Sequence, residues 1–151
     1  MANTMSGAPD VLHPRVLVEA FYQAFGHNKF ERLNEIVDEN WEDVPLAPGQ
    51  QPGREGLQAL FASFHSAFSN VEVTVEQMLV EGDDVAVRVA IEAVQNGPFL
   101  GVSANGKRVR ISAHDFHKIH NGLISRTDHL EDWFGWLFQV GAFPSHQEDI
   151  S

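Results

Sequence analysis

Two segments with strand-like character meet at a single Asn-Gly turn in the stretch HDFHKIHNGLISRTDH, residues 114–129. Asn-Gly between apolar-rich segments is the strongest short-range signal for a β-hairpin. A hairpin fixes which side chains lie opposite each other, so its register selects the residues that could form a site. This stretch therefore decides the end of the fold and supplies the first candidate for chemistry.

Two registers of this hairpin are open. A two-residue loop of Asn121 and Gly122 places Asp115 opposite Asp128, and like charges directly opposite each other are unfavourable. A three-residue loop ending at Gly122, where the backbone needs a positive φ, instead places His114 opposite Asp128. We favour the three-residue loop because it replaces a repulsion with a histidine–carboxylate pair.

Strand alternation sorts the hairpin side chains onto two faces. One face mixes apolar and ionisable groups, as a reactive pocket would. It carries His114, Phe116, Lys118, Ile124, Arg126, Asp128, Leu130 and Asp132. The other face could meet solvent or a second subunit, and the pattern alone does not decide which of the two faces is enclosed. It carries Asp115, His117, Ile119, Leu123, Thr127, His129 and Glu131.

A histidine beside a carboxylate in a partly apolar cavity suits proton transfer. Burial and the neighbouring charge can shift the pKa of either group toward neutral pH, where it can act as a general acid or base. On this argument His114 and Asp128 are the first candidates for catalysis. The alternative is a surface pair that only helps to register the sheet.

The composition is that of one acidic globular domain. A chain of 151 residues is most simply a single domain, and 43% of its residues are hydrophobic. The net charge of −11 argues against nucleic acid and anionic membranes, because both need clustered Lys and Arg. Eleven Phe and three Trp can line a cavity as well as fill a core.

The same sequence excludes or disfavours several other classes. Without cysteine, disulfides and thiolate chemistry are excluded. No stretch approaches the roughly 20 apolar residues of a membrane helix, and residues 1–10 lack the features of a secretory signal. We therefore expect a cytoplasmic protein.

Apolar periodicity predicts three helices followed by a four-stranded antiparallel meander. Helical spacing runs from Pro14 to Gly26, Asn28 and Glu31 resemble a capping box for a short second helix, and a third helix begins after residues 53–56. Residues 41–52 indicate a short strand and a loop, and alternation of period two begins at residue 71. Residues 95–107 are predicted to be a loop, and a final helical turn or two follows residue 133.

This order indicates an α+β fold in which three N-terminal helices pack on a strongly curved antiparallel sheet and leave a conical cavity. We expect residues 13–143 to form the single domain. Residues 1–12 are expected to be a disordered N-terminal segment, and residues 144–151 a C-terminal tail.

A second group of candidates lies outside the hairpin. Trp41 and Asp43 lie where a strand meets a proline-rich loop, at a possible cavity mouth; the alternative is a solvated acidic turn. Tyr22, the only tyrosine, could donate a hydrogen bond to a substrate oxygen or lie at the edge of the core. The remaining side chains expected to contact a substrate are Phe64, Phe116 and Arg126.

Four histidines crowd one region, which raises the question of a metal site. Strand alternation puts His114 and His117 on opposite faces, and His120 lies in the turn away from His129. No pair with His-x-His or helical His-x-x-x-His spacing is present. We therefore expect no metal.

Several motifs together carry a family resemblance. They are Gly106–Val109, Asp115–Ile124, Asp132, Val140–Ala142, Phe21-Tyr22, Trp41–Asp43 and Gly53–Leu57. With them the chain resembles SnoaL-like polyketide cyclases of the nuclear-transport-factor-2-like (cystatin-like α+β) superfamily, from about residue 14 to 143. The resemblance implies the curved-sheet fold and, as often in this superfamily, a homodimer formed through the sheet.

In such cyclases a cavity aspartate on the last strand is the acid and base of an intramolecular aldol closure, with a histidine on the neighbouring strand. By position, the resemblance implies these roles for Asp128 and His114, and Asp132 stands at another often-acidic position. The chain departs from the family pattern at two places. Lys118 stands where arginine is common, and Thr127-Asp128-His129 replaces a common His-Trp-Asp run.

We therefore expect an enzyme without a cofactor, of cyclase or isomerase type, acting on a small apolar or aromatic carbonyl compound. One alternative is a dimeric domain that binds a small molecule without changing it. Another is a steroid-isomerase-like or dehydratase-like relative that uses Asp43 with Tyr22. A third is an epoxide-hydrolase-like enzyme in which Arg126 bridges Asp128 and a second cavity carboxylate.

Overall fold

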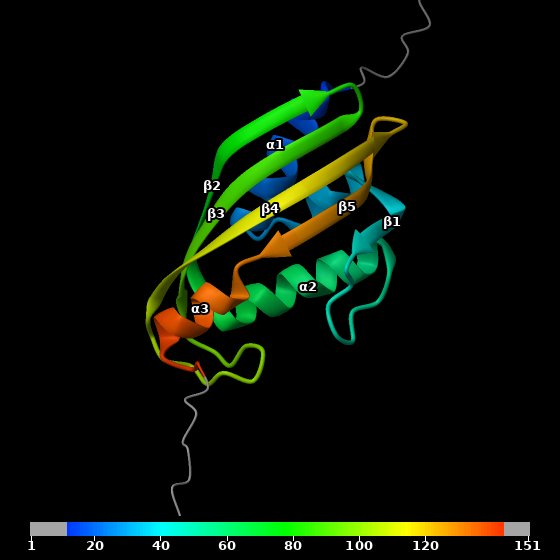
Figure 1. The fold of residues 1–151 in the computed structure, drawn as a ribbon. Coiled ribbons are helices and arrows are strands. Elements are labelled where there is room, and N and C mark those ends of the chain that lie inside the picture. Colours follow the sequence, from blue (N-terminus) through cyan, green and yellow to red (C-terminus); the bar gives the residue numbers. More distant parts are fainter. Residues whose placement is uncertain (1–11, 144–151) are drawn as a thin grey trace, which may run out of the picture.

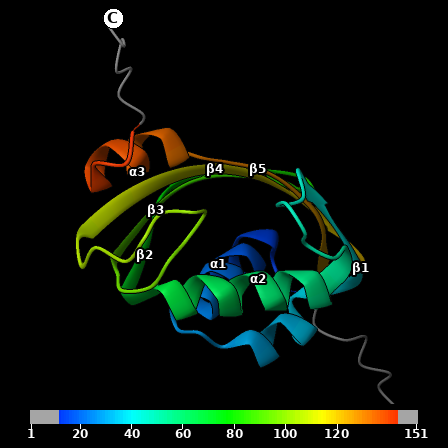
Figure 2. The same cartoon turned by 90° about the horizontal axis from the view of Figure 1, so that it is seen from below.

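A five-stranded sheet arches over two helices in the computed structural model, which describes residues 12–143 (Figures 1 and 2). The strands are β1 (Val37–Val44), β2 (Phe68–Glu81), β3 (Asp84–Gln95), β4 (Arg108–His120) and β5 (Leu123–Glu131). Their order is β1-β5-β4-β3-β2, with β1 parallel to β5 and the other pairs antiparallel. The predicted α+β fold and its meander are confirmed, and the sheet is not closed into a barrel.

The helices cover the concave face of the sheet. They are α1 (Pro14–Gly26) and α2 (Gly53–Ala67), and the short 3-10 helix η1 (Phe30–Glu35) connects α1 to β1. The last helix, α3 (Trp133–Val140), follows β5 and packs against β4. The core between helices and sheet is aromatic, with Phe64 stacked on Phe68 at a ring-centroid distance of 4.5 Å. No helix among residues 12–143 is both long enough and apolar enough to cross a membrane.

The expected capping box is wrong. The N-cap of η1 is Lys29, and no side chain caps it. Asn28 adopts a left-handed backbone with φ of 56° directly after α1, which suits an asparagine at a helix end. The expectations for residues 1–11 and 144–151 lie outside the described residues.

The last hairpin follows neither predicted register along its length. Asn121 and Gly122 both have positive φ, so the turn is a two-residue loop that pairs His120 with Leu123. A β-bulge then inserts Ser125, whose hydroxyl donates to the carbonyl oxygen of Lys118. Beyond a bulge the pairing shifts by one residue, which a count from the turn cannot reveal.

The bulge decides which ionisable residues lie opposite each other. His114 pairs with Leu130 and Asp128 pairs with Phe116, so the expected pairing of His114 with Asp128 is wrong. The register instead sets Asp115 opposite His129, replacing the repulsion of the simple two-residue register with an opposite-charge pair.

The enclosed face of the hairpin is also the opposite of the one we expected. Asp115 and His117 are buried, whereas His114, Phe116 and Lys118 are exposed. The reason lies in the whole length of β4, because the apolar side chains of the same parity fill the core. They are Val109, Ile111, Ala113 and Ile119. Asp115 and His117 alternate in step with these four apolar residues on one face of β4. Burial of the apolar residues in the core therefore encloses the two polar residues as well.

Gly56 should be intolerant of any side chain, because a Cβ atom built there lies 1.6 Å from the carbonyl oxygen of Gln51. We expect Gly56→Ala to lower the free energy of unfolding by about 3 kcal/mol, the upper range for overpacking a tight contact. Gly49→Ala is the control: no atom lies within 4 Å, so only its positive φ of 80° opposes alanine. That strain costs about 1–2 kcal/mol. Denaturation in urea measures both, and equal losses would contradict the prediction.

Candidate functional site

A chain of hydrogen bonds crosses the concave face between four elements. The Tyr22 hydroxyl on α1 lies 2.5 Å from Oδ2 of Asp115 and 2.8 Å from Nε2 of His117, both on β4. Nδ1 of His117 lies 2.9 Å from Oγ1 of Thr127 on β5. The Trp41 indole on β1 donates to the same Thr127 oxygen at 3.1 Å. All five side chains are buried, so the chain is shielded from bulk water.

Asp115 is the acidic end of this chain. Burial raises its pKa to about 6, although the hydrogen bond from Tyr22 lowers it. The negative charges of Glu131 and Asp43 raise this pKa further, and the charge on His129 lowers it. Oδ1 of Asp115 is buried and has no hydrogen-bond partner among the described residues. A buried oxygen of this kind is unusual and points to a functional group.

The two partners of Asp115 in the chain are neutral at physiological pH. Burial lowers the pKa of His117 to about 3, and the charge on His129 adds to the effect. Burial also raises the pKa of Tyr22 well above its ordinary value, and the charge on Asp115 adds to this increase. The chain therefore contains one titrating group in the range near neutrality, which is Asp115.

A second cluster centres on His129 of β5. Its Nε2 lies 3.0 Å from Oδ1 of Asp43, and its Nδ1 lies 2.7 Å from Oε1 of Glu131. Nε2 is also 2.8 Å from the carbonyl oxygen of Pro45. Both ring nitrogens therefore face acceptor oxygens, which favours a proton on each nitrogen. Hydrogen bonds to Asp43 and Glu131 raise the pKa of His129 to about 11. His129 is therefore a fixed cation across the strand pair from Asp115.

The loop after β1 is tied to this cluster. Gln50 donates from its side-chain amide to Oδ2 of Asp43 at 2.7 Å, and its side-chain oxygen accepts from the backbone of Ala47 at 2.9 Å. These bonds hold residues 45–52 close to the end of β1. The loop thereby forms one wall of a cleft.

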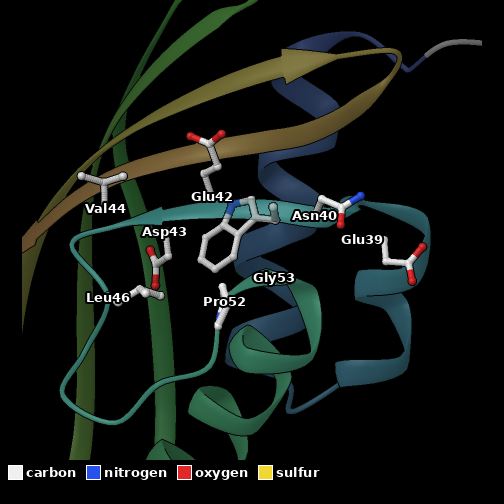
Figure 3. Close-up of a pocket in the computed structure, with 9 residues that line it drawn as sticks. Glu39, Asn40, Glu42, Asp43, Val44, Leu46, Pro52 and Gly53 are labelled. Atoms are coloured by element: carbon white, nitrogen blue, oxygen red, sulfur yellow. The ribbon is translucent and has the colours of Figure 1, made fainter.

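Two clefts border the polar chain. The first, of about 420 Å³, lies under β1 and is lined by Trp41, Asp43, Leu46 and Pro52 among others. Figure 3 shows Asp43, Leu46 and Pro52 on one side of β1, while Glu42 and Val44 point the other way. The second cleft, of about 550 Å³, lies between α1 and β2 and includes Tyr22. Asp115 lines neither cleft, but its chain partners Tyr22 and Trp41 do.

The structure does not bring together the catalytic pair expected from the sequence. His114 is exposed on the outer face, and Asp128 forms a two-pronged ion pair with Arg126 at 2.7 and 2.8 Å. This hydrogen bonding to Arg126 lowers the pKa of Asp128 below its ordinary value. Asp132, the second candidate acid, caps α3 by accepting from the backbone N–H of Gly135 at 2.8 Å.

The predicted substrate contacts divide between the two faces. Tyr22, Trp41 and Asp43 belong to the enclosed polar clusters. Phe64 is buried in the aromatic core, while the Phe116 side chain is 63% exposed on the outer face. Arg126 does bridge two carboxylates, those of Asp128 and Glu42, but all three side chains are well exposed.

Sequence reasoning took its hairpin candidates from the other face and so left out five residues of the enclosed polar clusters. They are Asp115, His117, Thr127, His129 and Glu131. A usable signal was present, since Asp115 and His117 share their parity with the apolar residues of β4. The resemblance implied an aspartate on the last strand facing a histidine on its neighbour; here the enclosed positions carry His129 on β5 and Asp115 on β4.

Within the described part of the chain, the histidines do not assemble a metal site. Among residues 12–143, no three His, Asp or Glu side chains are arranged to hold a metal ion. The arrangement can instead hold, donate and accept protons at a buried carboxylate flanked by a fixed cation.

Known structures share this fold over most of the chain. TsrD from Streptomyces laurentii is 27% identical with a TM-score of 0.79, covering 85% of this chain and 94% of that protein. A polyketide cyclase described as putative, from Bacillus cereus, is 27% identical with a TM-score of 0.74, covering 85% and 80% of the two chains. IdmH from Streptomyces antibioticus, at 23% identity and a TM-score of 0.76, shares the fold over 86% of this chain and 99% of its own.

Sequence comparison gives the family. A search of curated proteins found no match. The family model for SnoaL-like polyketide cyclases matches residues 15–140, which span both polar clusters, all five strands and all three α-helices save the first residue of α1. The chain therefore belongs to the SnoaL-like polyketide cyclase family.

Proposed function

We propose that this protein is an acid–base enzyme of cyclase or isomerase type that works without a cofactor on a small apolar carbonyl compound. Asp115 is the group that takes and returns the proton. The observation that carries the proposal is the buried carboxylate itself, held through Oδ2 by Tyr22 while Oδ1 has no partner among the described residues. Membership of the SnoaL-like family supports this class of chemistry.

The proton affinity of Asp115 suits the task. With a pKa of about 6, the carboxylate is mostly ionised at pH 7, yet it is a stronger base than an ordinary aspartate. Oδ1 removes a proton from the carbon next to the carbonyl: the C–H bond breaks, its electron pair enters the enolate, and the proton moves to Oδ1. The imidazolium of His129 across the strand pair lowers the pKa of Asp115 and so helps to keep the base ionised, against the opposing charges of Glu131 and Asp43.

The enolate can react further in two ways, and Asp115 returns the proton in both. In a cyclisation its carbon attacks a second carbonyl of the same molecule, and Asp115 returns the proton to the new alkoxide. In an isomerisation Asp115 returns the proton to a different carbon. We assign the cleft beside Asp43 as the approach for substrate, because Trp41 of the polar chain and Asp43 of the His129 cluster line it. Asp115 is buried and lines neither cleft, so side chains between the cleft and Oδ1 must move when the substrate binds.

Proton exchange tests this proposal without knowledge of the natural substrate. We expect the protein to accelerate exchange of the C1 protons of 2-tetralone, an aromatic ketone, for deuterium in D₂O, followed by proton NMR. The rate should rise as pH increases through about 6 and then level off, because only the ionised carboxylate is a base.

The same spectra distinguish the proposed enzyme from a domain that binds a small molecule without changing it. If 2-tetralone shifts protein resonances on binding but its protons do not exchange, the protein binds without catalysis and the proposal fails. If it neither binds nor exchanges, the proposed substrate class of small apolar carbonyl compounds is wrong.

The homodimer implied by the resemblance stays a prediction. Phe116 and Leu130 expose 63% and 74% of their surface on the outer face of the sheet, and a second copy would cover them. Sedimentation velocity checks this expectation, since a species of 16.8 kDa alone would contradict it.

A further inference from the structure

We propose that Thr127, held by Trp41, is a positioning residue that fixes the direction of the buried hydrogen-bond chain, so that the Tyr22 hydroxyl donates to Asp115 and not to His117. The inference deepens the proposed function, and its effect on turnover rests on that function. Its effect on protonation does not, because it follows from donors and acceptors alone.

The direction is set at the β1 end of the chain. An indole N–H can only donate, so Trp41 occupies one lone pair of the Thr127 oxygen. Thr127 is buried, and its hydroxyl contacts only Trp41 and His117 among the described residues. The hydroxyl proton therefore has one acceptor within reach, Nδ1 of His117.

The hydrogen bond from Thr127 to His117 fixes the positions of the protons on His117 and Tyr22. Because Nδ1 of His117 accepts, the proton of the neutral ring lies on Nε2, which donates to the Tyr22 oxygen. The Tyr22 proton is then directed to Oδ2 of Asp115. Four N–H or O–H groups thus point along one path that ends on the carboxylate.

The reverse direction leaves a proton without a partner. A protonated Asp115 would donate to Tyr22, Tyr22 to Nε2 of His117, and Nδ1–H to the Thr127 oxygen. The hydroxyl proton of Thr127 would then be buried with no acceptor, and an unsatisfied buried donor is unfavourable. The chain therefore favours the ionised form of Asp115 and opposes the effect of burial.

The other charged groups that affect the pKa of Asp115 are not part of the hydrogen-bond chain. They are His129 and Glu131 on β5 and Asp43 on β1. None of them bonds to Thr127, so a change at Thr127 alters the chain while these charges stay in place.

Thr127→Val tests the inference, because valine keeps the shape of threonine and removes the hydroxyl. In the wild type, ¹⁵N NMR should show His117 as the Nε2–H tautomer. In the variant a second tautomer should become populated, and the carboxyl ¹³C titration midpoint of Asp115 should rise by roughly 0.5–1 pH unit, the equivalent of one hydrogen bond. Thr127→Ser keeps the hydroxyl and should restore both wild-type values.

A second variant covers the case in which Thr127→Val does not fold. Trp41→Phe removes the indole N–H, together with part of the ring volume, and should give a smaller upward shift of the same midpoint. The inference is overturned if wild-type His117 is the Nδ1–H tautomer, or if the Asp115 midpoint is unchanged in a folded Thr127→Val protein.

The two proposals can fail separately. If the carboxyl midpoint of Asp115 moves in Thr127→Val but the pH midpoint of 2-tetralone exchange does not, the positioning role holds and Asp115 is not the base. If both midpoints move together, both proposals are supported.

Discussion

Replacing Asp115 with asparagine should lower protein-catalysed exchange of 2-tetralone by about 10²- to 10⁴-fold, the usual contribution of a general base. Asparagine has nearly the same shape, and its side-chain oxygen can still accept from Tyr22. It cannot take up a proton, so the loss comes from chemistry rather than from disrupted packing. Initial exchange rates at pH 7, measured by NMR, give the comparison.

Asp128→Asn is the matched control for this experiment. Asp128 lies on the outer face in an exposed pair with Arg126, and a surface substitution of this kind should change the rate by no more than about twofold. Comparison of the two variants therefore tests which face of the hairpin carries the catalytic group. Should Asp128→Asn abolish exchange while Asp115→Asn retains it, the outer face would be the catalytic one and our proposal would be wrong.

The Asp115→Asn protein should also show a distinctive dependence of stability on pH. The folded-state pKa of Asp115 is raised to about 6 from 3.8, so the folded state is penalised wherever the group is ionised. The penalty is absent below pH 3.8 and fully present above pH 6. Relative to wild type, the variant should gain up to about 3 kcal/mol of unfolding free energy across that window. This gain would show that the variant is folded when its activity is lost.

The second large effect concerns two histidines, one of which should stay neutral and the other protonated over most of the accessible pH range. His117, with a pKa lowered to about 3 by burial, should stay neutral at pH 5. His129, with a pKa raised to about 11 by Asp43 and Glu131, should stay protonated at pH 9. Imidazole ¹⁵N and ¹³C shifts report both states, and titration of either ring near pH 6.5 would contradict the prediction.

The lowered pKa of His117 should make the protein sensitive to acid. In the unfolded chain this histidine binds a proton below pH 6.5, but in the folded protein it does so only near pH 3. Unfolding is therefore favoured progressively as pH falls through this window, by up to about 5 kcal/mol. Asp115 acts in the opposite sense between pH 6 and 3.8, so the net loss should be steepest below that range.

His117→Gln isolates this contribution. The variant has no imidazole to protonate, so its unfolding free energy relative to wild type should improve as the pH is lowered from 7 to 3.5. Denaturant titrations at several pH values measure the difference. His129 gives the contrary sign: its stabilising interactions are complete below pH 6.5 and are lost as pH rises through 11.

Much of the fold could be predicted because its signals are local. The helical spacing from Pro14 to Gly26 gave α1, and the Asn121-Gly122 turn adopts the positive φ values that its residues favour. The alternation after residue 71 gave the meander. Each of these patterns depends on neighbours a few residues apart, which the sequence displays directly.

The bulge at Ser125 had no comparable local signal. Its position is linked to β1, because Ile124 donates its backbone N–H to the carbonyl oxygen of Ile36 while β5 also pairs with β4. A strand with partners on both sides must satisfy two registers at once. The turn alone could not disclose this constraint, so the pairing of His114 with Asp128 was predicted wrongly.

By itself the sequence determined the order of the elements, the acidic character and the side chains available for chemistry. Only the tertiary structure decided which of them meet: Tyr22 and Asp115 are 93 residues apart in the chain, and Trp41 and Thr127 are 86 apart. A hydrogen-bond chain needs donors and acceptors about 3 Å apart, and such distances between remote segments exist only after the sheet has curved around the helices. For that reason the polar hairpin was visible in the sequence, but its enclosed face was not.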